Sequence, residues 1–159
     1  MEYRIEELKP KILVGKKLRM SFAHNTTAQL WKSFMPHRRE ITQAVGSDLY
    51  SMQIYPSAFF QPVDPFCEFE KWAAIEVSEA GEIPDGMEQY TLPPGTYAVF
   101  LYKGSSSEGA TVFRYILGTW LPASLYELDD RPHFEVLGSN YKNNDPSSEE
   151  EIWIPVKLK

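Results

Sequence analysis

The carboxylate of Glu135 is the first candidate for a chemical role, because it alternates with the apolar residues Phe134 and Val136 in a strand-like run. Side chains alternate along a strand, so Phe134 and Glu135 must point to opposite faces of the sheet. If Phe134 and Val136 pack under helices, Glu135 points to the open face. There it is either an ordinary solvent-facing carboxylate or the floor of an aromatic groove. A cationic organic ligand would satisfy a groove carboxylate through an ion pair and cation–π contacts.

A second carboxylate, Glu127, lies eight residues before Glu135. It either contributes to the same groove or pairs with Arg131. Two acidic runs, Asp129-Asp130 and Glu149-Glu150-Glu151, are candidate contacts for a basic protein partner. Simple solubility is the default explanation of both runs.

Other motifs that carry chemistry are missing from the sequence. The loop Gly104–Ser107 lacks the Lys-Ser/Thr ending with which a phosphate loop grips phosphate and magnesium. The three histidines, His24, His37 and His133, stand far apart without metal-ligand spacing, so we predict no metal and no cofactor. The single cysteine, Cys67, is flanked by a carboxylate that disfavours the thiolate, and we expect it to be inert.

The composition describes a globular chain and excludes several classes of function. The 159 residues carry 16 Lys and Arg against 22 Asp and Glu, a formal net charge of −6, with 43% hydrophobic and 14% aromatic residues. An acidic chain without a basic run is not expected to bind nucleic acid directly, since phosphate contacts supply that affinity. No transmembrane run occurs, and the charged start is unlike a signal peptide. We therefore expect one cytoplasmic domain, residues 1–159, without a membrane partner.

The residue pattern divides this domain into two halves, about 1–80 and 88–159, each laid out as β-α-β-β. Apolar residues at helical spacing predict one helix after Asn25, kinked at Pro36, and a second around Phe113–Leu121. Strands are expected at Tyr3–Leu8, Lys11–Phe22, Leu49–Tyr55, Phe69–Val77, Thr96–Tyr102, His133–Leu137 and Glu151–Val156. The predicted architecture is α+β, an antiparallel sheet with both helices on one face and a ligand groove between the halves.

Over nearly its whole length, and most strongly in the second half, the chain resembles the GyrI-like family. This is the effector-binding domain of AraC-type and MerR-type multidrug-responsive regulators, which also occurs as a stand-alone protein. The motifs that carry the resemblance are Leu92–Phe100, Trp120–Ser124, Pro132–Glu135 and Glu151–Val156, in this order and spacing. The resemblance implies a duplicated β-α-β-β fold with an aromatic pocket between the halves. It also implies that Glu135 is the pocket glutamate that receives cationic or amphipathic ligands.

The expected ligand-binding residues are this glutamate, the nearby Glu127, and aromatic residues of the strands, loops and second helix. They are Glu135, Trp120, Tyr50, Tyr55, Phe60, Trp72, Phe100, Tyr102, Tyr126, Glu127 and Trp153. Alternation assigns part of this aromatic set to the core. Tyr50 and Tyr55, for example, face opposite sides of one strand, and Trp120 has the spacing of a core residue.

Three functions follow as alternatives. The first is a non-enzymatic module that binds a cationic, aromatic small molecule and passes its ligand status to a regulatory protein. The second is a hydrolase of strained, cyclopropane-containing natural products, which the resemblance suggests, with Glu135 as general base and Tyr97 or Tyr126 as its partner. The third is a protein-interaction inhibitor, since the family takes its name from an inhibitor of DNA gyrase. The expected function is ligand binding, and catalysis is left open.

Overall fold

The computed structural model describes residues 1–159, with the side chain of Ser106 left out. Nine strands form in the described chain: β1 (Tyr3–Leu8), β2 (Lys11–Met20), β3 (Leu49–Ile54), β4 (Phe69–Val77), β5 (Glu88–Leu92), β6 (Gly95–Lys103), β7 (Tyr126–Leu128), β8 (His133–Leu137) and β9 (Glu149–Leu158). Every pairing is antiparallel, in the order β1-β6-β9-β8-β3-β4-β2-β5, with β7 beside β9. This confirms the predicted α+β class.

Two helical segments accompany the sheet. Helix α1 (Thr27–Phe34) passes into a 3-10 turn at Met35–Glu40, as Pro36 predicted, because proline cannot donate to the helical ladder. Helix α2 (Gly109–Tyr115) follows a 3-10 turn at Ser106–Glu108, and it continues through a wider π turn at Ile116–Trp120 into α3 (Leu121–Ala123). The second segment thus forms one continuous wall.

The sheet is a duplicated unit: β1, β2, β3 and β4 of the first half correspond, in that order, to β5, β6, β8 and β9 of the second. With this correspondence, the strand order is the same when it is followed from either edge of the sheet. The first strand of each half pairs with the second strand of the other half: β1 pairs with β6, and β5 pairs with β2. The short strands β5 and β7 were not expected from the sequence. One residue of β5 and none of β7 is buried, so neither shows the alternation that marks a strand.

The repeat extends to a pair of buried side chains. Trp72 and Trp153 occupy matching places on β4 and β9, and each indole donates to the glutamate two residues before it. The Nε1–Oε1 distances are 2.7 Å to Glu70 and 3.1 Å to Glu151. The sequence therefore contains a Glu-x-Trp unit in each half that marks equivalent positions.

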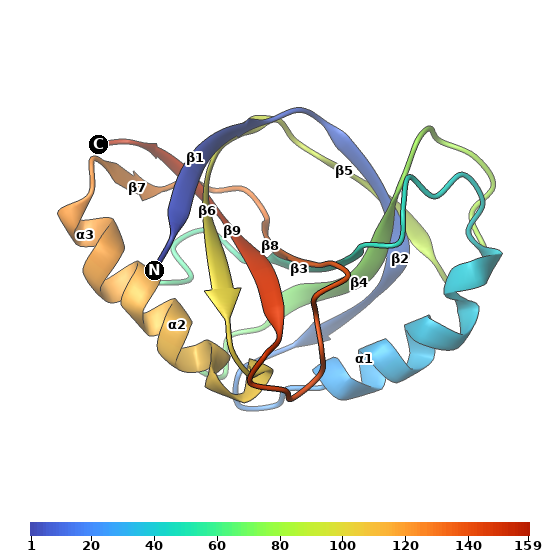
Figure 1. The fold of residues 1–159 in the computed structure, drawn as a ribbon, viewed down its shortest axis with the longest axis horizontal. Coiled ribbons are helices and arrows are strands. Elements are labelled where there is room, and N and C mark those ends of the chain that lie inside the picture. Colours follow the sequence, from blue (N-terminus) through green and yellow to red (C-terminus); the bar gives the residue numbers. More distant parts are fainter.

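Both helices pack on one face of the sheet, each over its own half (Figure 1). The sheet curls toward the other face, because Leu8, Leu13 and Leu92 meet in one cluster although β1 and β5 are its opposite edges. The curled interior is filled by large rings, among them Trp72 and Phe134. The central strands β3 and β8 remain between the two helices.

The faces of β8 are the reverse of the arrangement considered from the sequence. Phe134 is fully buried in the curled interior with Val136 packed against it, and neither lies under a helix. Glu135 therefore points to the helix-bearing face, into the gap between α1 and α2. Alternation predicted that the two side chains oppose each other, but the choice of face depends on the direction in which the sheet curls.

Candidate ligand-binding site

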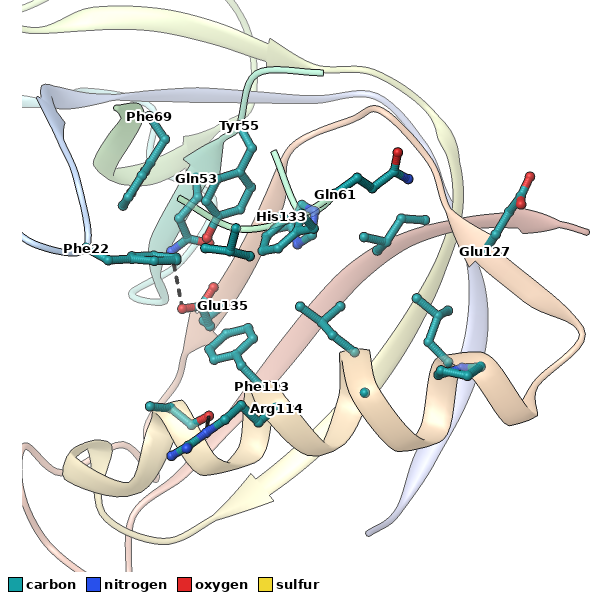
Figure 2. A pocket seen from close by; sticks show the side chains of 18 of the residues that line it. Phe22, Gln53, Tyr55, Gln61, Phe69, Phe113, Arg114, Glu127, His133 and Glu135 are labelled. Atoms are coloured by element: carbon teal, nitrogen blue, oxygen red, sulfur yellow. Dashed lines mark hydrogen bonds between the residues drawn. The ribbon is translucent and has the colours of Figure 1, made fainter. Parts of the chain in front are cut away.

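A cavity of about 1160 Å³ opens over β3 and β8 on the helix-bearing face. Both halves contribute to it: Phe22, Gln53 and Lys71 come from the first half, and Phe113 and Glu135 come from the second. Figure 2 shows Glu135 between the rings of Phe22 and Phe69 on one side and Phe113 of α2 on the other. The ligand groove expected between the halves thus corresponds to an actual cavity.

One wall of the cavity is the segment that runs from α2 to α3. Phe113, Leu117 and Leu121 line the cavity at helical spacing. Val112 and Ile116 are buried against the sheet. The segment therefore presents one apolar face to the core and a second to the cavity.

The opposite wall is a cluster of rings around Tyr55. The ring centroid of Tyr55 lies 4.9 Å from both Phe60 and His133 and 5.1 Å from Phe69. These separations suit edge-to-face and tilted packing of aromatic rings. Burial lowers the pKa of His133 to about 3, with a smaller effect from Arg131, so this imidazole is neutral at physiological pH. The wall is therefore aromatic and uncharged.

The floor between the walls is polar, and the strand register assembles it. Gln53 of β3 pairs with Lys71 of β4 on one side and with His133 of β8 on the other, while Glu135 lies two residues further along β8. Gln53 Nε2 donates to Glu135 Oε1 over 3.3 Å (Figure 2). Turning its amide over places the nitrogen 3.0 Å from Glu135 Oε2 and lets its oxygen accept from Lys71 Nζ, which satisfies both ends.

Two ionisable groups, Glu135 and Lys71, lie at this floor, and a third, Glu150, does not line the cavity but interacts with both. Burial raises the pKa of Glu135, and the Lys71 ammonium offsets part of that effect. Burial likewise lowers the pKa of Lys71, which is only 8% exposed, against the opposing attraction of Glu135 and Glu150. The pKa of Glu150 is raised to about 7, first by burial and then by Glu135. The floor is thus partly desolvated, and charges there interact more strongly than in water.

Charged side chains also surround the cavity. Glu127 lines the cavity, and its Oε1 lies 3.9 Å from Lys157 Nζ. Arg131, considered as the partner of Glu127, pairs with Asp129, with 3.0 Å between Nε and Oδ2. The charged lining consists of four basic and two acidic side chains: Lys71, Arg114, Lys157, Lys159, Glu127 and Glu135. The lining is therefore net basic although the whole chain is net acidic.

Some of the residues expected from the sequence lie together at this cavity. They are Glu135, Tyr55, Phe60, Tyr126 and Glu127. The other six do not line it. Tyr50, Trp72 and Trp153 fill the curled interior on the opposite face. For Tyr50 and Trp72 this follows from alternation with Gln53 and Lys71, the cavity-facing residues of their strands.

Phe100 and Tyr102 lie under the α2 segment on the second half of the sheet, and Trp120 packs from that segment against Phe100. Tyr97, considered as a partner for a catalytic Glu135, also lies elsewhere. Its hydroxyl donates to the Pro132 carbonyl over 2.8 Å within the interior cluster. Tyr126 is the other tyrosine considered for that role, and it does line the cavity.

Further residues that line the cavity were not predicted from the sequence: Phe22, Gln53, Phe69, Lys71, Phe113, Leu117 and His133. A signal existed for Gln53, since it shares a face with Tyr55 on one strand. Lys71 could also have been noticed, because it alternates onto the same face as the apolar residues Phe69 and Ala73, where a lysine needs polar partners. The two helix residues were assigned to the core alone, since spacing does not reveal a second apolar face.

Comparison with known proteins identifies the family. The family described as GyrI-like small molecule binding domain matches residues 1–157, so the chain belongs to this family, as its motifs indicated. The chain is 29% identical to the transcriptional regulator BrlR of Pseudomonas aeruginosa over 157 residues, which cover 98% of this chain and 56% of BrlR. It therefore spans just over half the length of that relative.

Solved structures share the fold. The EcmrR C-terminal domain superposes with a TM-score of 0.73 at 14% identity, over 99% of this chain and 98% of that domain. SAV2435, solved with bound tetraphenylphosphonium, gives a TM-score of 0.67 at 20% identity, over 99% and 94% of the two chains. At these identities the likeness concerns the fold.

Two features are absent from the residues that the structure describes. Neither helical segment is long and apolar enough to cross a membrane. Among the same residues, no three His, Cys, Asp or Glu side chains gather closely enough to hold a metal ion.

Proposed function

We propose that the protein binds an aromatic small molecule with a cationic group in this cavity, and that Glu135 supplies the counter-charge. The observation that carries the proposal is the partly desolvated Glu135 between aromatic walls of a cavity of about 1160 Å³. A cation lying there gains an ion pair in a weakly screened setting and contacts with the faces of the rings. Tyr55, Phe60 and Tyr126 are the proposed ring contacts from the sequence analysis.

Membership of a small-molecule-binding family supports this proposal, as does similarity to a transcriptional regulator. The tetraphenylphosphonium found in SAV2435 supplies a suitable probe, an aromatic cation without hydrogen-bond donors. We further propose that the liganded protein acts in the cytoplasm through a regulatory protein partner. The acidic side chains Asp129 and Glu149 are already engaged by Arg131 and Lys103, which supports ligand binding over an acidic docking surface as its main function.

The test is calorimetric titration with tetraphenylphosphonium, using neutral triphenylphosphine oxide for comparison. The wild-type protein should bind the cation, and Glu135→Gln should weaken binding by roughly tenfold or more, because a desolvated ion pair is lost. Glu127→Gln is the matched control, since Glu127 lies at the rim beside Lys157 and its loss should change affinity by no more than about threefold. Equal affinity of Glu135→Gln and wild type for the cation would refute the role of Glu135.

The same samples separate binding from hydrolysis. After overnight incubation with any ligand that binds, mass spectrometry should return that ligand unchanged. A product heavier by one water would instead assign the cavity to an enzyme, and Tyr126→Phe would then test the remaining tyrosine.

A further inference from the structure

A buried lysine on the cavity floor is unused by the proposed cation site. Lys71 is 8% exposed and lines the same cavity as Glu135. Its ammonium is the hydrogen-bond partner of the Gln53 amide oxygen in the orientation that also lets Gln53 donate to Glu135. A cation and an anion thus lie on either side of one amide at the bottom of the cavity.

This pairing limits what a purely cationic ligand gains. Of the groups that line the floor, Lys71 and Glu135 offset each other, so a cation placed against Glu135 also meets the repulsion of the Lys71 ammonium. A simple anion meets the corresponding repulsion from Glu135. A ligand that carries both charges avoids both penalties, because it offers each floor group an opposite charge.

The remaining charges of the cavity favour an anionic group on the ligand as well. Lys71 is joined by three basic side chains at the rim, against Glu127 alone. Of these, Lys157 lies 3.9 Å from Glu127, and Lys159 donates to the carbonyls of Pro122 and Ser124. A ligand without an anionic group would leave this net basic lining uncompensated.

We propose that the preferred ligand is an aromatic zwitterion, whose cationic centre lies against Glu135 and whose carboxylate or similar anionic group accepts from Lys71. This rests on the proposed function, and it specifies the chemical class of the ligand. The aromatic body packs between the ring cluster around Tyr55 and the helical wall at Phe113. Lys71 then acts as a specificity-determining residue that distinguishes zwitterions from simple cations.

The test compares two nearly isosteric phosphonium compounds, (3-carboxypropyl)triphenylphosphonium and its primary carboxamide. They differ in the charge at one end, so their affinity ratio reports on that charge. At pH 7, calorimetry with the wild-type protein should show the acid binding about tenfold more tightly than the amide, as expected for a charge-assisted hydrogen bond. This comparison needs no mutation and so does not depend on the folding of a variant.

Two variants then locate the preference. Lys71→Met keeps a long apolar stem, and it should abolish or invert the acid-to-amide ratio, with the amide binding more tightly than it does to wild type. Lys32→Met, which removes an exposed cation that does not line the cavity, should leave the ratio within about twofold. Thermal melts of both variants verify that they are folded.

The outcomes separate the two proposals. If tetraphenylphosphonium and the amide bind while the acid binds no better, the zwitterion proposal fails and the cation site stands. A preference for the acid that persists in Lys71→Met also overturns it. If none of the three compounds binds, the proposed function itself fails.

Discussion

The imidazole of His133 is buried among aromatic rings, and its pKa is lowered to about 3. The free energy of unfolding should therefore depend on pH through this side chain. The unfolded chain protonates this side chain below about pH 6.5, whereas the folded protein does so only near pH 3. The contribution of this group to the free energy of unfolding is therefore fully present above pH 6.5. This contribution is lost progressively as the pH falls from 6.5 toward 3.

Replacing this imidazole should flatten the acid side of the stability profile. His133→Phe keeps a ring against Tyr55 and Phe60. Between pH 7 and pH 4, we expect its free energy of unfolding to fall by about 2 to 3 kcal/mol less than that of the wild type. Urea unfolding at a series of pH values measures the difference. His24→Phe, at an exposed position, is the control and should follow the wild-type curve. A His133→Phe profile parallel to wild type would contradict the low pKa.

At the scale of elements, the segment from α2 to α3 has two apolar faces with different roles. Ile116 is fully buried against β6 and β9, and Phe113 is half-buried and lines the cavity. The first residue contributes to stability through packing, and the second contributes to the surface that a ligand meets. Substitution of Ile116 should therefore mainly lower stability, whereas substitution of Phe113 should mainly lower ligand affinity.

Two alanine substitutions test this division. Ile116→Ala should lower the free energy of unfolding by about 2 to 5 kcal/mol, because it leaves a cavity in the core. Phe113→Ala should cost less stability and weaken binding of an aromatic cation by roughly tenfold, since a ring contact is lost. Chemical unfolding and calorimetric titration of both variants provide the comparison. Two variants that lose stability and affinity in parallel would rule out separate roles for the two faces.

The sequence predicted elements better than it predicted the cavity. Helical spacing located both helices, and alternation correctly opposed Phe134 to Glu135. The face of Glu135 stayed conditional, because alternation does not say which face of β3 and β8 bears the helices, and only the curl of the sheet distinguishes the two faces. That curl depends on β1 and β5 crossing to the other half, a long-range pairing that leaves no local pattern. Lys71 was overlooked for a related reason, since a lysine gains a role inside a sheet only through partners on other strands.

At the scale of the whole molecule, a repeated frame holds a site that is not repeated. Matching β3 with β8 and β4 with β9 takes Gln53 to Glu135 and Lys71 to Ile152. Ile152 is buried under the α2 segment, so the second half has no counterpart of the buried ammonium. The two halves therefore contribute different chemistry to one cavity.

A ligand bound in this cavity should stabilise both halves together. At one hundred times its dissociation constant, a ligand adds about 2.7 kcal/mol to the free energy of unfolding. Hydrogen exchange should then slow both in the first-half segment 53–63 and in the α2 segment, which line opposite walls. The edge strand β5, which contributes no lining residue, is the internal reference for local effects. Protection confined to one wall would show that the ligand binds elsewhere.

The unequal halves also have a consequence for the handedness of a ligand. Glu135, Lys71 and the ring of Phe60 come from β8, from β4 and from the loop after β3, so they mark three different corners around the cavity. No mirror plane relates a carboxylate, an ammonium and a ring held in this way. A ligand whose cation, acid and aromatic group radiate from one stereocentre can satisfy all three corners in only one of its mirror-image forms. A protein built from a duplicated unit would thus select a single enantiomer from a racemic mixture.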